Sequence, residues 1–257
     1  MKHLILGFGS IGKRHYRNLK ILTHPEDEIV TVDPDPNSGA DYRKWNSLLA
    51  GWVVYICTPT DNHISILFDA VGEGARAVFV EKPLGLKGEQ FGTLKEIPIV
   101  CGYNYRFHSE YQSLYNRGGD ISLMNVIGVE NMTEKYGHTA LETMLSHYLD
   151  LGLWLFGVPK SVQVVNRGWC ATASLNFPTA HLNIYSQIDG NYRRAQAEVV
   201  FHSGGYDHFG LIDKSELDAM YVKQMIAWLN FLETGERGQL CFLEDALKVQ
   251  RLMAEAK

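Results

Sequence analysis

The run Gly7-Phe8-Gly9-Ser10-Ile11-Gly12 follows a short apolar stretch and precedes a segment suited to a helix. Its spacing matches G-x-G-x-x-G, in which glycines let the backbone turn tightly and approach a pyrophosphate at a helix N-terminus. Asp33 comes about 20 residues after the last glycine, where a carboxylate can accept hydrogen bonds from the ribose hydroxyls of an adenosine. Together the motif and the acid predict a dinucleotide-binding site.

The residues after Asp33 indicate which dinucleotide is bound. The chain continues with Pro34 and Asp35, and no Arg or Lys stands beside Asp33. Two carboxylates at this point would repel the 2′-phosphate of NADP, whereas the free ribose of NAD can bond to Asp33. We therefore expect NAD as the cofactor.

A second set of candidate residues lies in the middle of the chain. His147 and Asp150 are three residues apart in an apolar segment typical of a helix, so they share one face of it. An imidazole titrates near neutral pH and can act as a general acid or base, and a carboxylate beside it can orient the ring. A hydrogen-bonded helix histidine without a catalytic role fits the same pattern. No metal is expected, because the spacing places no third ligand near the pair.

The elements that must position these residues change in character near residue 105. Up to that point short β-rich runs alternate with helical segments, and beyond it alternating apolar and polar runs follow a long helical segment. The expected fold is α/β, with a doubly wound parallel Rossmann sheet in an NAD-binding domain over 1–105. An α+β domain for substrate binding and oligomerisation, built on a mainly antiparallel sheet, is expected over 106–257. The expected strands are 3–6, 29–33, 52–57, 77–81, 97–102, 161–166, 181–185 and 195–202, and the expected helices are 11–22, 43–50, 62–71, 87–96, 139–156, 215–232 and 243–256.

Several motifs carry a resemblance to a known family. They are Gly-Phe-Gly-Ser-Ile-Gly-Lys-Arg-His at 7–15, Cys57-Thr58-Pro59-Thr60-Asp61-Asn62-His63, Glu81-Lys82-Pro83-Leu84-Gly85, and Gly102-Tyr103-Asn104-Tyr105-Arg106-Phe107. In order and spacing the first half resembles the glucose-fructose oxidoreductase, inositol dehydrogenase and rhizopine catabolism (Gfo/Idh/MocA) family. Ser146-His147-Tyr148-Leu149-Asp150 resembles the family's helix beside the active site. Beyond about residue 160 the similarity is one of pattern only, and the chain is shorter than typical members.

The resemblance implies roles for individual residues. It places beside the cofactor Gly7, Phe8, Gly9, Ser10, Ile11, Gly12, Asp33, Thr58, Pro59, His63, Glu81 and Lys82. It implies Lys82 and His147 as catalytic residues, with Asp150 behind the histidine, and Lys82, Asn104, Arg106 and His147 in contact with the substrate. An ammonium at the end of a parallel strand can hydrogen-bond the hydroxyl being oxidised and stabilise charge on its oxygen as hydride leaves carbon. The resemblance also implies a cis bond between Lys82 and Pro83 and a homodimer or larger homo-oligomer packed through the C-terminal sheets.

The predicted activity is that of an NAD-dependent dehydrogenase acting on a secondary alcohol of a sugar, nucleotide sugar or cyclic polyol. The family also contains members in which NAD cycles and a glycosidic bond is broken. An acidic residue usually stands three or four positions before the family's histidine, whereas this chain has Thr143 and Met144 there. Glu142, five residues before His147, would project from a different part of an α-helix. An NAD-binding sensor or scaffold with lost or weak catalysis is therefore the alternative.

The bulk composition is that of an ordinary globular protein. The chain has 257 residues, of which 46% are hydrophobic and 21% charged, and its net charge is -5. This charge argues against nucleic-acid or anionic-membrane binding, which needs clustered Lys and Arg. Four well-separated cysteines without a CxxC pair favour thiols in a reducing compartment. Because the sequence shows neither a signal-peptide pattern nor a long apolar span, we expect a cytoplasmic protein that acts on a small molecule.

Overall fold

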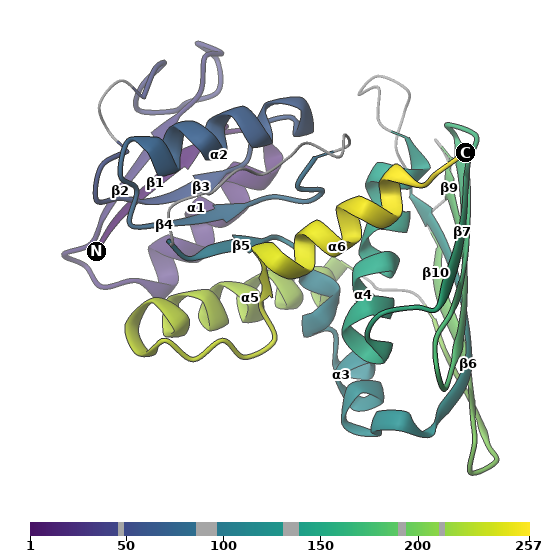
Figure 1. The fold of residues 1–257 in the computed structure, drawn as a ribbon. Coiled ribbons are helices and arrows are strands. Elements are labelled where there is room, and N and C mark those ends of the chain that lie inside the picture. The colour runs from purple at the N-terminus through teal and green to yellow at the C-terminus, as the bar shows by residue number, and fades with distance from the viewer. Residues whose placement is uncertain (46–48, 86–96, 131–138, 190–193, 211–213) are drawn as a thin grey trace. The chain divides into compact units, whose positions relative to one another are not determined.

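The computed structural model describes residues 1–45, 49–85, 97–130, 139–189, 194–210 and 214–257 (Figure 1). The chain forms two compact units. The first consists of Met1–Tyr103 and Tyr221–Ala246, and the second of Asn104–Met220 and Leu247–Lys257. The change of pattern near residue 105 predicted that all of 106–257 belongs to the second domain. The structure differs because residues 221–246 supply a helix and an edge strand to the first unit.

The first unit is built on sheet A, whose strands are short, apolar and almost entirely buried. Such runs are typical of parallel strands covered on both faces. The strand order is β12-β5-β4-β3-β1-β2, in which β12 is antiparallel and the other five strands are parallel. The bounds are β1 Lys2–Leu6, β2 Glu28–Val32, β3 Val53–Ile56, β4 Ala77–Val80, β5 Ile99–Cys101 and β12 Cys241–Phe242.

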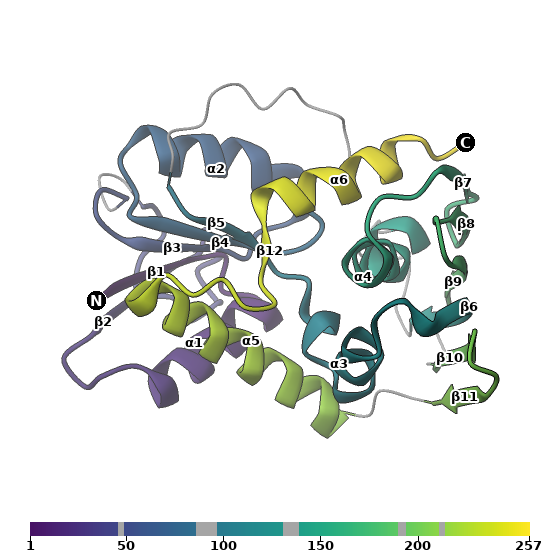
Figure 2. The ribbon, with the colours of Figure 1, turned by 60° about the horizontal axis from the view of Figure 1, so that its bottom comes forward.

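Helices lie on both faces of sheet A. Figure 2 shows α1 (Ser10–Leu22) and α5 (Lys214–Thr234) along one face and α2 (His63–Gly72) on the other, after a 3-10 turn at Thr60–Asn62. Trp228 of α5 is fully buried, with its ring edge-on to Phe79 of β4 at 6.0 Å between centroids. This burial of aromatic surface accounts for the inclusion of α5 from Tyr221 onward in the first unit.

The helix expected over 43–50 is wrong at the described residues of that range. Asp41 accepts hydrogen bonds from the backbone N–H and the hydroxyl of Thr31, and Tyr42 bridges to Val32. These contacts hold the chain alongside β2 instead of letting it coil. The helix expected over 87–96 lies outside the described residues.

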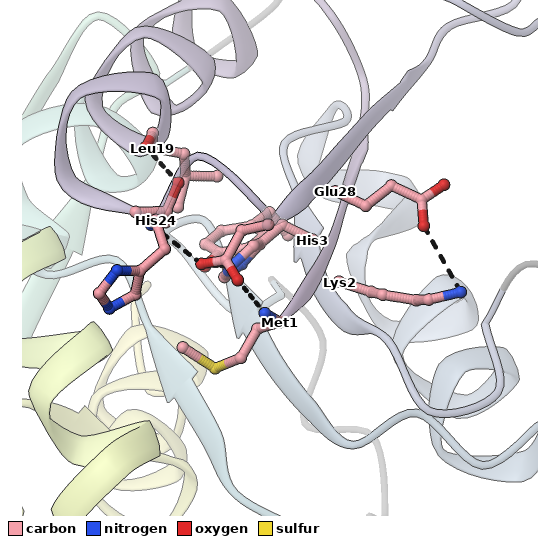
Figure 3. A network of polar contacts seen from close by, with 9 residues as sticks. Met1, Lys2, His3, Leu19, His24 and Glu28 are labelled. Atoms are coloured by element: carbon pink, nitrogen blue, oxygen red, sulfur yellow. Dashed lines mark hydrogen bonds and ion pairs between the residues drawn. The ribbon is translucent and has the colours of Figure 1, made fainter.

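Polar contacts join the start of β1 to the connection between α1 and β2 (Figure 3). The ammonium of Met1 bonds to the carboxylate of Asp27, which also accepts the N–H of His24. His3 is fully buried, and its Nδ1 lies 3.0 Å from the hydroxyl of Tyr55. Burial lowers the pKa of His3 to about 4, so its ring is neutral at neutral pH.

The second unit is built on sheet B, with strand order β11-β10-β6-β9-β8-β7. All neighbours in it are antiparallel except β6 and β9, which are parallel. The strands expected at 161–166, 181–185 and 195–202 correspond to β7, β9 and β10. The other three strands, β6, β8 and β11, are not among the expected ranges. The bounds are β6 Ile121–Glu130, β7 Ser161–Asn166, β8 Cys170–Asn176, β9 His181–Ile188, β10 Arg194–Phe201 and β11 Tyr206–Phe209.

One face of sheet B is covered by α4 (Ser146–Phe156), as Figures 1 and 2 show. A Cβ at Gly152 of α4 would lie 2.5 Å from Leu182, and one at Gly128 of β6 would lie 2.6 Å from Tyr148. Glycine therefore lets helix and sheet approach closely. The unit also contains α3 (Ser109–Asn116), α6 (Leu243–Ala254) from Leu247 onward, and 3-10 turns at Asn104–Phe107 and Gly118–Asp120. In the part of the chain that is described, no helix has the length and apolarity needed to cross a membrane.

Candidate functional site

The glycine turn between β1 and α1 is shaped by close contacts within the first unit. Gly7 has φ +91°, and a Cβ there would lie 2.7 Å from the carbonyl carbon of Cys57. A Cβ at Gly12 would lie 2.0 Å from the carbonyl oxygen of Gly7. Gly9 is different, because a Cβ there would meet no heavy atom of the described residues within 4 Å. The fold itself thus requires two of the three glycines and leaves open space beside the third.

This turn lies where a ligand crevice is expected in an open parallel sheet. The order of sheet A reverses at β1, which has β2 on one side and β3 on the other. Ligands bind outside the carboxyl ends of the strands at such a switch point. Gly7 follows β1, and Thr58 and Pro59 lie just beyond the end of β3. Within the described part of the chain no side chain caps the first turn of α1, so its N–H groups can bind an anion.

Asp33 holds the glycine turn as well as standing at the position predicted for ribose binding. Its Oδ2 accepts the N–H of Phe8 at 2.6 Å, and its Oδ1 accepts the N–H of Asp35 at 2.9 Å. A carboxylate offers about four lone-pair sites, so these two bonds leave capacity for a diol. The bond to Phe8 gives Asp33 a structural role that the sequence analysis did not foresee.

Lys82 follows β4 and lies at the same carboxyl edge of sheet A. The Lys82–Pro83 peptide bond is cis, which confirms the prediction. Glu81 beside it is 5% exposed, and its Oε1 lies 2.7 Å from Nε2 of His15 on α1. A Cβ at Gly102 would lie 3.0 Å from the Glu81 carboxylate. His15 is the last residue of the 7–15 motif, and the motif itself predicts no contact between it and Glu81.

His63, predicted to contact the cofactor, bonds to the backbone of two loops in the structure. Its Nδ1 lies 2.8 Å from the carbonyl oxygen of Pro83, and its Nε2 lies 2.8 Å from that of Thr58. The side chain is 1% exposed, and burial lowers the pKa of His63. The ring therefore joins the loop after β3 to the loop after β4.

His147 lies in the second unit, in the first turn of α4. Its ring stacks on Tyr105 with centroids 4.2 Å apart and an interplanar angle of 10°. The Tyr105 hydroxyl donates to the sulfur of Met144, and His147 is 6% exposed. A parallel aromatic neighbour restricts rotation of the imidazole, which suits a group that must present one nitrogen.

A buried ion pair joins two other predicted site residues. Arg106 donates from Nε to Oδ2 of Asp150 at 2.9 Å and from Nη2 to Oδ1 at 2.6 Å. Both side chains are almost fully buried, and this two-bond geometry is the strong form of an Arg–carboxylate contact. Nearby Asn104 is 1% exposed. The roles predicted for Asp150 toward His147, and for Arg106 and Asn104 toward a substrate, stay predictions.

A π-helical turn at Leu141–Leu145 precedes α4 in place of the uniform helix expected over 139–156. The N–H of Ser146 bonds to the carbonyl of Leu141, five residues earlier. Such a turn brings residues five apart nearer to one face than an α-helix does, so Glu142 is less far around the helix from His147 than expected.

The polar residues of this turn bond to Thr139, which lies just before it. Oε2 of Glu142 accepts the N–H of Thr139 at 2.5 Å, and the Thr139 hydroxyl accepts the N–H of Glu142 at 3.4 Å. This is a capping box, and its T-x-x-E pattern was visible in the sequence. The Thr143 hydroxyl donates to the carbonyl of Thr139. Among the described residues, no group of three metal-ligating side chains occurs.

Known proteins resemble this chain in fold, and the sequence comparisons found no match. No protein-family model matches the chain, and no curated protein is similar to it. A probable dehydrogenase from Thermotoga maritima has a TM-score of 0.82 at 18% identity, covering 100% of this chain and 96% of that one. The scyllo-inositol dehydrogenase from Lactobacillus casei with bound NAD(H) and scyllo-inositol has a TM-score of 0.80 at 15% identity, covering 100% and 95%. The WlbA dehydrogenase from Thermus thermophilus in complex with NAD and UDP-GlcNAcA has a TM-score of 0.78 at 19% identity, covering 99% and 94%.

These likenesses confirm the predicted fold class. The chain has a Rossmann-type parallel sheet and a second, mainly antiparallel sheet, as inositol and sugar dehydrogenases of this fold do.

Proposed function

We propose that this chain is an NAD-dependent dehydrogenase that oxidises or reduces a secondary alcohol of a sugar, nucleotide sugar or cyclic polyol. The glycine turn carries the proposal, because Gly9 leaves open space at the N-terminus of α1 while Asp33 stands beside the turn. Two solved structures of the same fold contain NAD or NAD(H), which supports the choice of cofactor.

The described residues of the first unit fit NAD. The pyrophosphate would lie against Gly9, where the uncapped N–H groups of α1 favour negative charge. The adenosine ribose would bond to Asp33. Asp35 beside it is exposed and negative, which disfavours the 2′-phosphate of NADP. Thr58 and Pro59, at the end of β3, would lie along the other side of the cofactor.

The proposed chemistry divides between two side chains. NAD supplies the hydride acceptor when the alcohol is oxidised. Lys82 would hydrogen-bond the alcohol oxygen and stabilise the charge that develops on it as the C–H bond breaks. His147 would accept the hydroxyl proton and NAD the hydride, which leaves the carbonyl product. In the reverse direction His147 returns the proton to the oxygen.

The test is a panel of sugars, nucleotide sugars and inositols assayed for NADH formation. We expect Lys82→Ala to lower turnover by roughly two orders of magnitude while NAD affinity stays nearly unchanged. Lys82→Arg should not restore turnover, because a planar guanidinium cannot take the place of an ammonium. Lys223→Ala, which changes an exposed lysine of the same unit, is the matched control. Accumulation of NADH separates a dehydrogenase from an enzyme that recycles NAD while it cleaves a glycosidic bond.

The alternative is an NAD-binding sensor or scaffold with weak or lost catalysis. The hydrogen bonds of the turn before His147 favour this alternative, because the Glu142 carboxylate and the Thr143 hydroxyl both bond to Thr139 where the family has an acidic partner for the histidine. Calorimetry that shows micromolar NAD binding, combined with no NADH formation across the whole panel, would support this reading over the dehydrogenase.

We also propose a homodimer or larger homo-oligomer that packs through the open face of sheet B. That face is mixed rather than apolar: Asn183 accepts from Ser174 and donates to Asn125, and Val200 and Tyr206 are 36% and 60% exposed. We expect light scattering to give at least a dimer mass at micromolar concentration. Asn183→Arg, which places a charge on the central strand β9, should lower it. A monomer mass for the unmodified chain would contradict the proposal.

The proposed compartment is the cytoplasm. None of the four cysteines forms a disulfide, and three of them are buried. Such thiols fit a reducing compartment. Imaging of the chain fused to a fluorescent protein in its own cells tests this placement.

A further inference from the structure

Lys82 stands between two residues that buried histidines hold. His15 contacts Glu81 on one side, with 2.7 Å between Nε2 and Oε1. His63 contacts Pro83 on the other, with 2.8 Å between Nδ1 and the carbonyl oxygen. Each histidine is 1% exposed, and all five residues belong to the first unit.

The contact from His15 reaches the backbone of Lys82 through one carboxylate. Oε1 of Glu81 is bonded to His15, while its Oε2 accepts the N–H of Lys82 at 3.3 Å. The His15 ring packs edge-on against Phe79 at 5.2 Å and Tyr221 at 6.0 Å between centroids. A ring packed on two sides cannot swing away, so the position of the carboxylate follows that of α1.

The contact from His63 connects Lys82 to a second loop. Both ring nitrogens lie 2.8 Å from carbonyl oxygens, those of Pro83 and Thr58. A carbonyl oxygen can only accept, so the neutral ring donates to one of the two and packs against the other. The ring thereby sets the distance between the loop after β4 and the loop after β3. The charged groups that act on it are Glu81 and Lys82 themselves.

We propose that His15 and His63 are positioning residues for Lys82. They hold its backbone from both sides, so that the ammonium reaches one place at the carboxyl edge of sheet A. A lysine side chain has four flexible methylenes, and it presents its charge reproducibly only when its backbone is fixed. The inference rests on the proposed function only for the statement that Lys82 touches substrate.

A misplacement of about 1 Å in a reacting group can lower a rate by about a hundredfold, so a small shift of this backbone is measurable in turnover. A histidine that serves only the stability of the core would lower the unfolding temperature and leave Lys82 where it is. The two accounts therefore differ in what happens to the lysine.

The experiment follows Lys82 directly in the full chain. Lysines are reductively methylated with 13C-formaldehyde, and the dimethyl-Lys82 signal is assigned by its absence in Lys82→Ala. The variants are His15→Leu and His63→Leu, which remove the bonds, and His15→Gln and His63→Gln, which retain one donor. His3→Gln is the matched control, because His3 is another buried histidine of the first unit and its Nδ1 contacts the hydroxyl of Tyr55.

We expect both leucine variants to move the Lys82 signal toward those of exposed lysines and to lower kcat roughly tenfold to a hundredfold, with KM for NAD nearly unchanged. The glutamine variants should restore most of the signal position. His3→Gln should lower the unfolding temperature without moving the signal.

The proposal is overturned if the leucine variants, or His15→Phe and His63→Phe where leucine prevents folding, leave the signal in place or shift it no more than His3→Gln does. Full turnover of Lys82→Ala, with the signal still shifted by the histidine variants, would instead reject the catalytic role of Lys82 and keep the positioning role.

Discussion

Alanine at Gly12 and alanine at Gly9 distinguish the glycine that the fold requires from the glycine that the cofactor requires. A Cβ at Gly12 would lie 2.0 Å from the carbonyl oxygen of Gly7 and 3.0 Å from its carbonyl carbon. Ordinary contacts are about 3.5 Å, so the backbone of the turn has to move by more than about 1 Å. Gly9 has φ -73° and open space around the new methyl group, so alanine fits there without strain.

The expected magnitudes follow from this geometry. Overpacking against backbone at Gly12 should cost about 3 kcal/mol of unfolding free energy, the upper end for such changes. At about 2–4 °C per kcal/mol for a chain of this size, Tm should fall by about 6–12 °C. Gly9→Ala should change unfolding free energy by less than about 0.5 kcal/mol. It should weaken NAD at least tenfold, about 1.4 kcal/mol, because the methyl group takes the space proposed for the pyrophosphate.

The assay is thermal unfolding of both variants, followed by calorimetric titration with NAD. Wild-type protein and Gly39→Ala, which also meets no atom within 4 Å but has φ +81°, separate the effect of backbone strain from that of contact. Equal Tm values for Gly12→Ala and Gly9→Ala would refute the close approach within the turn. Unchanged NAD affinity in Gly9→Ala would refute the placement of the pyrophosphate.

Three further predictions concern other contacts of the two units. Asp33→Ala should weaken NAD by about 1–3 kcal/mol in calorimetry and also lower Tm, because the bond to Phe8 is lost; tighter binding of NADP than of NAD by the unmodified chain would contradict the assignment. Arg106→Ala should destabilise the second unit by about 3–5 kcal/mol in denaturant unfolding, because the Asp150 carboxylate stays buried without the guanidinium that pairs with it. The double variant Arg106→Met with Asp150→Leu should recover most of this loss of stability. The folded pKa of His3 lies below the unfolded value, so the stability that its neutral ring contributes is complete above pH 6.5 and is lost as pH falls through about 4. This loss of unfolding free energy, at most about 3 kcal/mol, should be smaller in His3→Gln when Tm is measured between pH 6.5 and pH 4.

The sequence alone determined the features that depend on neighbours along the chain. The glycine motif and Asp33 predicted the turn between β1 and α1, because only glycine tolerates the close approaches at Gly7 and Gly12. Short, continuous apolar runs predicted the five parallel strands, since strands buried on both faces need no alternation. The cis bond before Pro83 was predicted from the resemblance of the Glu-Lys-Pro motif.

The tertiary structure decided which buried polar groups meet. Glu81 bonds to His15 across 66 residues, and Asp150 bonds to Arg106 across 44. Spacing along one helix predicts only that Asp150 shares a face with His147, and that role stays a prediction beside the observed bond to Arg106. The sequence did not predict the π turn either. Every residue from Leu141 to Asp150 is buried, so no alternation of polar and apolar faces distinguishes a π turn from an α-helix there.

The structure also decided where residues 221–246 belong. Their amphipathic pattern predicts a helix but not the surface that it covers, and β12 is only two residues long. Burial of Trp228 against Phe79 and pairing of β12 with β5 place them in the first unit. These contacts join segments more than a hundred residues apart. The local sequence pattern does not predict them, because their free energy comes from surfaces that meet only after the chain has folded.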